Sequence, residues 1–226
     1  MDLVAKVEFF RGALGFEGLT EGQLEEIAEA AFQTRFAKGD IIFDQNDRCE
    51  RFHAVASGLV KVSISSPSGL RITYLIARPI EPLNLVGPFL GSPRTLSAEA
   101  IEDSVVVCMK REDFTAMVFK NPVLVTNIIS IFGHALDSAN SRMIDMFEKC
   151  VDQRLLRVLY TLNNKFGDVL NFTSSELAEL AGTTWESTLR AMGRLRRMGI
   201  VETGRGVVRI IEPDTLENLG SDTLWL

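Results

Sequence analysis

The spacing of apolar residues changes twice along the chain and so divides it into three segments. The first helical signal lies at 19–32, where apolar residues recur every three or four positions behind Thr20, a residue suited to a helix N-cap. From about 33 to 109, short β-branched and aromatic runs are separated by glycine, proline, asparagine or aspartate. We expect strands at 40–43, 52–56, 59–64, 72–76 and 105–109. Many short strands without a long helix between them predict an antiparallel sandwich or barrel.

Beyond residue 113 the apolar spacing becomes helical and repeats every seven residues. Successive members of the series are separated by alternating steps of four and three. They are Val125, Ile129, Phe132, Leu136, Ala139, Met143, Met146 and Cys150. A register kept through more than three heptads is typical of a coiled-coil seam, here roughly 39 Å long. We therefore expect a dimerisation helix, and an amphipathic helix packed on its own domain is the alternative.

Residues 151–211 have the order of elements found in a winged helix-turn-helix. Thr173 or Ser174 is suited to cap the second helix, Gly182 to end it, and Thr184 to cap the third. The expected elements are helices at 151–166, 174–181 and 185–198 and a hairpin at 199–211. Helix, tight turn, helix and hairpin in this order predict a DNA-binding unit.

The third of these helices carries side chains of the types that read base edges. Glu186 and Arg190 are one turn apart with Ser187 beside them, and arginine pairs with guanine while glutamate accepts from cytosine. The opposite face is expected to be buried and consists of Leu189, Met192, Leu195 and Met198. A solvated face with a Glu–Arg pair is the alternative. Residues 182–211 hold six arginines against two acidic residues, and this local excess of positive charge favours the DNA-reading interpretation.

The overall composition by itself argues against a nucleic-acid partner, because the whole chain of 226 residues carries a formal charge of −6. The acidity lies outside the basic segment, since residues 1–150 hold 15 basic and 20 acidic groups. The length and 46% hydrophobic content suit two globular domains. No apolar run reaches the length of a membrane span and the N-terminus lacks a signal-peptide pattern, so we expect a cytoplasmic protein without a membrane partner.

Several segments in order resemble the CRP/FNR superfamily of bacterial transcription regulators. They are 36–43, 55–62, 93–98 and 100–104 in the first half, and 172–178, 182–190 and 195–201 in the second. The resemblance implies an α+β protein with a β jelly-roll effector domain over 1–117, a dimerisation helix over 118–150 and a winged helix-turn-helix over 151–226. It also implies a homodimer on a roughly palindromic double-stranded DNA site, a small-molecule or gas effector, and contact with RNA polymerase.

The resemblance also carries over site residues. The family's base-reading Arg, Glu and Arg fall on Trp185, Glu186 and Arg190, so the first position departs from the family pattern. An indole cannot make the bidentate contact to guanine that an arginine makes, and we expect a different base there, with stacking against a thymine methyl as one way to read it. Further DNA contacts are expected from Ser187, from Thr173, Ser175 and Thr183 on phosphates, and from Arg205 at the wing tip.

The effector is not evident from the sequence. Arg94 and Thr95 fall where the family holds a cyclic phosphate, but Gly87 is followed by Pro88, which supplies neither a carboxylate nor a backbone N–H. We therefore expect an effector other than cyclic AMP. An iron–sulfur cluster is not expected, because no cysteine precedes Cys49.

Haem sensing of nitric oxide or carbon monoxide, or redox sensing, stays open as an alternative. The candidate ligands are His53, His134, Met143, Met146, Cys49, Cys108 and Cys150. A cupin-like metal enzyme or ligand-binding module is a remote alternative, because such enzymes need clustered histidines and this chain has two in total. No catalytic residue and no dedicated metal site are predicted. A third alternative is a protein–protein adaptor that keeps the helix-turn-helix only as a scaffold.

Overall fold

The computed structural model describes residues 1–220, which divide into two compact units. The first comprises Met1–Leu70 and Tyr74–Gly133, and the second comprises Arg71–Thr73 and the described residues from His134 onward. The elements before the long helix are α1 (Leu3–Gly12), α2 (Glu21–Ala30), β1 (Phe32–Phe36), β2 (Ile41–Phe43), β3 (Arg51–Ser57), β4 (Val60–Ser65), β5 (Arg71–Ala77), α3 (Gly87–Leu90), β6 (Ser97–Ala100), β7 (Ser104–Lys110) and α4 (Arg111–Lys120).

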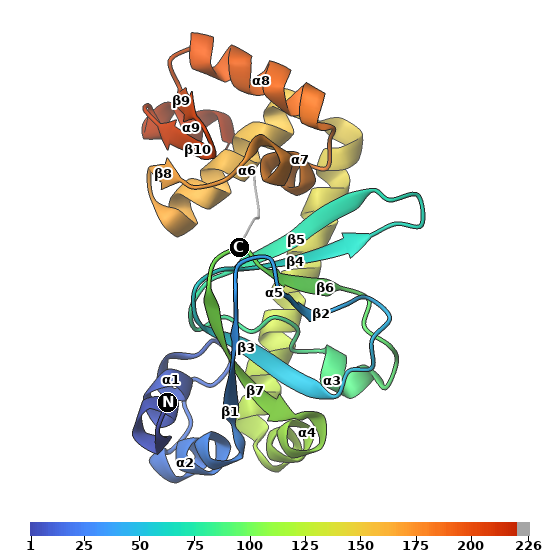
Figure 1. The fold of residues 1–226 in the computed structure, drawn as a ribbon, viewed down its shortest axis with the longest axis vertical. Helices are drawn as coiled ribbons and strands as arrows, with labels where there is room; N and C mark the ends of the chain where they lie inside the picture. The colour runs from blue at the N-terminus through green and yellow to red at the C-terminus, as the bar shows by residue number, and fades with distance from the viewer. Residues whose placement is uncertain (221–226) are drawn as a thin grey trace. The chain divides into compact units, whose positions relative to one another are not determined.

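Two antiparallel sheets form the first unit, with strand orders β1-β7-β3 and β2-β6-β4-β5 (Figure 1). Strand β7 lies between its neighbours, so Cys108 is paired with Phe32 on one side and with His53 on the other. The predicted jelly-roll-like sandwich is confirmed, and each of the five expected strands is present within one or two residues. Strands β1 and β6 were not predicted, because their short polar-rich runs resemble loops in sequence and become strands only by pairing with β7, β2 and β4.

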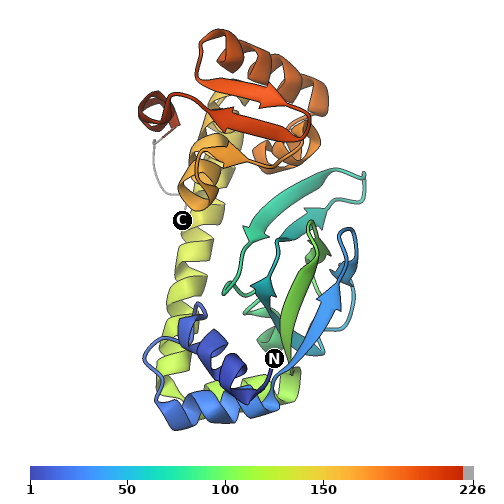
Figure 2. The same cartoon turned by 60° about the vertical axis from the view of Figure 1, so that its left-hand side comes forward.

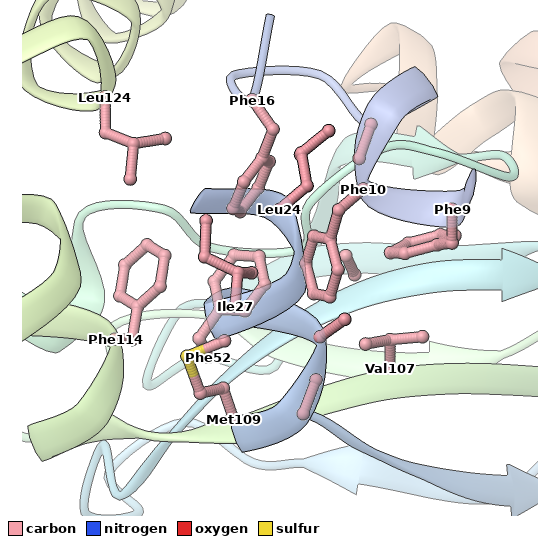
Figure 3. Packing of buried hydrophobic residues seen from close by; sticks show 14 of the residues in the cluster. Phe9, Phe10, Phe16, Leu24, Ile27, Phe52, Val107, Met109, Phe114 and Leu124 are labelled. Atoms are coloured by element: carbon pink, nitrogen blue, oxygen red, sulfur yellow. The ribbon is translucent and has the colours of Figure 1, made fainter. Parts of the chain in front are cut away.

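The larger core of this unit lies between the sheet β1-β7-β3 and the helices that cover it. Figure 3 shows Leu24 and Ile27 of α2 pointing toward Phe52 of β3 and Phe114 of α4. The Phe52 and Phe114 rings are stacked with their centroids 4.3 Å apart. The predicted cap Thr20 begins α2, and α1, which the sequence reading missed, adds further phenylalanines to the same cluster. Figures 1 and 2 show α1, α2 and α4 gathered at one end of the sheets.

The long helix α5 (Pro122–Glu148) is shorter at both ends than the expected segment 118–150. Residues up to Lys120 belong to α4, and the chain bends by 108° between the two helices. The residue before a proline avoids helical backbone, and Asn121 is extended here, so α5 begins at Pro122. The expectation that the helix extends to Cys150 is wrong, because α5 ends at Glu148 and Cys150 takes the N-cap position of α6 (Val151–Phe166).

The two halves of α5 belong to different units, and each half buries residues in its own unit. Leu124 is buried in the core of the first unit, with Val125 packed partly against it. Asp145 is buried in the second unit. Exposed apolar side chains follow the predicted seam at Ile129, Phe132, Leu136 and Met143, with Ala139 and Met146 half-buried. Among the residues that the model covers, no single helix is long and apolar enough to cross a membrane, and only the bent pair α4 and α5 reaches that threshold when joined.

The rest of the second unit follows the predicted order. Its elements after α6 are β8 (Val169–Leu170), α7 (Ser174–Ala181), α8 (Trp185–Arg197), β9 (Val201–Gly204), β10 (Val207–Ile210) and α9 (Pro213–Gly220). Thr173 and Thr184 cap α7 and α8, as expected, and Gly182 ends α7 in left-handed backbone with φ of 58°. A residue with a side chain is strained in that backbone, which explains the glycine. The three strands form a small sheet of order β8-β10-β9, and α9 packs on α6.

Candidate DNA-reading helix and effector site

The first turn of α8 holds a connected set of hydrogen bonds. The Thr184 hydroxyl oxygen accepts from the Ser187 backbone N–H at 3.2 Å, and the same hydroxyl donates to the Ser187 hydroxyl at 3.1 Å. Ser187 also accepts from Nη2 of Arg190 at 3.1 Å. The Arg190 guanidinium is therefore held by the helix that carries it, which reduces the side-chain freedom that a DNA contact would have to remove.

The exposed surface of α8 begins with Trp185 and Glu186 and continues to Leu189 and Arg190. Glu186 lies at the helix N-terminus, where its own backbone N–H and the Thr184 hydroxyl lower the pKa of its carboxyl, with a smaller contribution from the positive charge of Arg190. It is therefore ionised at neutral pH and acts as an acceptor only.

The expected buried face of α8 is partly wrong. Met192 and Leu195 are buried as predicted, but Leu189 is 41% exposed and Met198 is 62% exposed. Thr188 and Ala191 take their places in the interior. Leu189 is exposed because positions 188, 191, 192 and 195 form one stripe at helical spacing and position 189 lies to the side of it. Met198 lies at the C-cap, beyond the last residue of α8.

The predicted phosphate-contacting residues lie on different elements of the second unit. Thr173 is engaged in a capping box, because its hydroxyl donates to Glu176 at 2.7 Å and accepts from the Glu176 backbone N–H at 3.2 Å. Ser175 is exposed on the first turn of α7, and Thr183 is half-buried in the turn before α8. Arg205 is exposed at the tip of the β9–β10 hairpin, the predicted wing.

Two ion pairs link α6 to its neighbours in the second unit, one to α8 and one to α5. Arg194 of α8 and Asp152 of α6 make a two-point contact, with Nε to Oδ2 at 2.6 Å and Nη2 to Oδ1 as the second bond. This contact holds the pKa of the Asp152 carboxyl below its ordinary value. Arg157 of α6 pairs with Asp145 of α5 inside the protein, and its Nη2 also donates to the Ser141 hydroxyl at 3.0 Å. Sequence reasoning missed both pairs because their partners lie 42 and 12 residues apart.

The expected effector residues are not brought together as a polar pocket. Arg94 is only 5% exposed, its Nη2 donates to the Arg51 carbonyl at 2.8 Å, and its guanidinium lies 3.9 Å from the centre of the Phe43 ring. Thr95 is exposed. Gly87 is buried at the start of α3, and a Cβ there would lie 2.7 Å from the Asn84 side chain. The guanidinium of Arg94 is therefore already in contact with a backbone carbonyl and an aromatic ring of the protein.

Comparison with known proteins agrees with this layout. A family model described as "Cyclic nucleotide-binding domain" matches residues 33–121, and one described as "Crp-like helix-turn-helix domain" matches 153–219. The "Cyclic AMP receptor protein" of Thermus thermophilus is 28% identical over 211 residues, covering 92% of this chain and 97% of that protein. The "Fumarate and nitrate reduction regulatory protein" of Escherichia coli is 22% identical and covers 89% of this chain and 82% of its own length.

A solved structure gives the same fold. FixK2 from Bradyrhizobium japonicum aligns with a TM-score of 0.76 at 20% identity, over 85% of this chain and 98% of that one. The chain belongs to the CRP/FNR family of transcription regulators. Members of this family are DNA-binding regulators rather than enzymes, so the cupin-like enzyme alternative no longer applies.

The candidate axial ligands of this CRP/FNR regulator are scattered. His53 is buried, with Nδ1 3.5 Å from Nη2 of Arg94 and its ring tilted against Phe43. Cys49 and Cys108 are buried, and burial raises the pKa of both thiols. His134, Met143 and Cys150 are exposed, and Met146 is half-buried. Within residues 1–220, no three His, Cys, Asp or Glu side chains gather as a metal-binding group.

Burial, followed by the positive charges of Arg94 and Arg51, lowers the pKa of His53 from 6.5 to about 3. Between these two values the unfolded regulator binds a proton at His53 that the folded one does not, so stability falls as the pH is lowered. The slope attributable to His53 approaches about 1.4 kcal/mol per pH unit, and its contribution is complete above pH 6.5.

This slope is measured by urea unfolding of the wild type and His53→Gln between pH 4 and 7. The wild type is expected to lose more stability than the variant as the pH falls. His134→Gln serves as the matched control, because His134 is exposed, and its curve should follow that of the wild type. Equal pH dependence of wild type and His53→Gln would contradict the neutral, buried state of His53.

Proposed function

We propose that this CRP/FNR regulator binds a roughly palindromic double-stranded DNA site as a homodimer, with α8 of each copy in the major groove. The observation that carries the proposal is the exposed pair Glu186 and Arg190, with Arg190 held by Ser187 at 3.1 Å. Both side chains have the chemistry of base-edge readers. The surrounding segment 182–211 has a charge of +4, from six arginines and two acidic residues, and this favours the DNA backbone as well. Contact with RNA polymerase belongs to the same proposal.

We propose that the other predicted DNA-binding residues contact the phosphate backbone of the DNA. Ser175, Thr183 and Arg205 come from three different segments, and hydroxyls and arginines are the groups that commonly hold phosphates. The Thr173 hydroxyl is already bonded to Glu176, so its contribution to phosphate binding would come through the position it gives to α7. These contacts would set the register of α8 on the duplex and leave discrimination to α8 itself.

The dimer interface is proposed along α5. Exposed apolar side chains at Ile129, Phe132, Leu136 and Met143 keep the four- and three-residue steps of a seam, and solvent-exposed apolar rows of this length are covered in stable proteins. Toward the end of the helix the exposed position shifts to Phe147, which is 86% exposed, while Met146 turns toward its own unit. A straight helix drifts by about 20° per heptad against a seven-residue repeat, which accounts for the shift.

The effector is proposed to be a small molecule or gas other than a cyclic nucleotide. Arg94, the cation expected at the phosphate position, is bonded to the Arg51 carbonyl and lies against the Phe43 ring. A cyclic phosphate would have to compete with these contacts for the buried guanidinium. Pro88 beside Gly87 adds no carboxylate for a ribose hydroxyl. The cyclic-nucleotide-binding-like domain would then transmit the presence of a different ligand to the DNA-binding unit.

The dimer is tested by changing one seam residue. Leu136→Asp is expected to weaken self-association at least about ten-fold, because the change places a charge in an apolar interface. Sedimentation equilibrium of the full chain measures it. Ser130→Asp, which adds the same charge at an exposed position off the seam, should leave self-association unchanged. A monomeric wild type at micromolar concentration, or an unaffected Leu136→Asp variant, would rule out this interface.

Base reading is tested at Arg190. Arg190→Ala should remove about 1 to 3 kcal/mol of discrimination at one base pair of a site obtained by random selection. Binding is measured against all single-base variants of that site at fixed salt. Arg196→Ala removes the same charge from the other end of α8 and should weaken all variants alike or not at all. If Arg190→Ala also weakens every variant equally, Arg190 is a backbone contact and not a base reader.

Cyclic AMP is tested by calorimetric titration. At 1 mM ligand, about 100 times a Kd of 10 μM, a binder would gain about 2.7 kcal/mol of stability. We expect no heat of binding and no thermal shift for this protein with cyclic AMP or cyclic GMP. The cyclic AMP receptor protein of Thermus thermophilus, titrated in parallel, is the positive control. Saturable binding that Arg94→Ala abolishes would refute the proposed effector class.

A further inference from the structure

The exposed surface of α8 contains an apolar strip formed by Trp185, which was expected there, and Leu189, which was expected in the core. Trp185 is 52% exposed and Leu189, one turn later, is 41% exposed. Residues four apart lie on the same side of a helix, so the two side chains are neighbours. Beside them on the same helix run the polar positions Glu186 and Arg190. The exposed surface thus carries an apolar strip and a polar strip side by side.

We propose that Trp185 and Leu189 read thymine methyl groups in the major groove, next to the bases read by Glu186 and Arg190. This inference rests on the proposed DNA-binding function and names the base class that the first position of α8 selects. It assigns specificity to an apolar contact, because the indole of Trp185 has one donor and no acceptor and cannot form a two-point contact with a base.

The chemistry of the groove supports this occupant. The thymine C5-methyl is the apolar group among the base-edge features of the major groove, and side-chain carbons read it by contact. The charge of the surface favours nucleic acid over an apolar protein partner. Arg190, Arg196 and Arg197 are exposed on the same helix, and Arg205 and Arg209 are exposed on the adjacent hairpin. A protein-binding patch of the usual kind has few charges in its centre.

The spacing of the two side chains also fits DNA. Four residues advance about 6 Å along a helix axis. Base pairs in one strand are stacked about 3.4 Å apart, so two steps span about 6.8 Å. Trp185 and Leu189 can therefore reach methyl groups on neighbouring base pairs or on pairs separated by one. We expect one or two thymines per half-site at these positions.

The experiment removes only the methyl group. A site selected by the full-length wild-type protein is synthesised with each thymine in turn replaced by deoxyuridine in both half-sites, and Kd is measured by fluorescence anisotropy at fixed salt. At one or two positions the replacement should weaken binding about four-fold for each methyl lost, the factor expected for one buried methylene-sized group. Other positions should be insensitive.

Variants connect the effect to its residues. With Trp185→Ala, one uridine-sensitive position should become insensitive, and Leu189→Ala should do the same at a neighbouring one. Trp185→Phe, which keeps an aromatic ring without the N–H, should retain most of the sensitivity. Met198→Ala removes another exposed apolar side chain, at the far end of α8, and should behave as the wild type. Circular dichroism checks that each variant is folded.

The outcomes separate this inference from the proposed function. Sequence-selective binding with no uridine-sensitive position, or sensitivity that survives both alanine variants, overturns methyl reading and leaves DNA regulation standing. Loss of binding in Trp185→Phe with no effect of uridine assigns the contact to the indole N–H and also overturns the inference. A wild type that selects no sequence at all overturns both.

Discussion

A buried ion pair joins the long helix α5 to α6 inside the second unit, and it constrains how these two helices pack. Asp145 of α5 and Arg157 of α6 are each 3% exposed, and Arg157 also bonds to Ser141 while Lys149 lies 3.7 Å from the same carboxylate. Two charges buried this far from water are stable only when they are paired and hydrogen-bonded. Removing one partner of such a pair typically lowers the free energy of unfolding by about 3 to 5 kcal/mol. The α5–α6 arrangement therefore has little freedom to vary.

The contacts around this pair extend to the turn before α8. Arg142 of α5 donates to the Leu180 carbonyl at 2.9 Å, so the last turn of α7 is tied to the same helix. Met146 lies against Gly182, where a Cβ would clash with the methionine methyl. Glycine at that position therefore serves two purposes, since it allows left-handed backbone and also leaves room for Met146. The C-terminal half of α5 and the helix-turn-helix form one packed body for these reasons.

The interior of the first unit surrounds Arg94 and His53 with partners from its own strands. Arg94 donates to a backbone carbonyl and lies over Phe43, and His53 beside it stays neutral because a second charge there would be both desolvated and repelled. A buried guanidinium needs acceptors and an aromatic or polar surrounding, and here the protein supplies them from its own strands.

The sequence by itself determined the features that depend on neighbours along the chain. Thr20, Thr173 and Thr184 cap helices as expected because an N-cap acts on N–H groups two or three residues away. Gly182 ends α7 as expected because left-handed backbone is a local requirement that favours glycine, although its contact with Met146 was not foreseen. The strand-rich first half and the winged order of the second half follow from short-range patterns of the same kind.

Only the tertiary structure decided which surfaces these elements present. Leu189 and Trp185 share an exposed side of α8 because the space beneath the helix is filled by Thr188, Ala191 and their neighbours, and an apolar residue in the sequence does not reveal which side is covered. Arg94 contacts the Arg51 carbonyl and the Phe43 ring, and both residues are more than 40 positions away in the sequence, so these contacts could not be predicted from it. Burial and charge pairing arise from contacts between residues far apart in sequence, and those contacts exist only after the chain has packed.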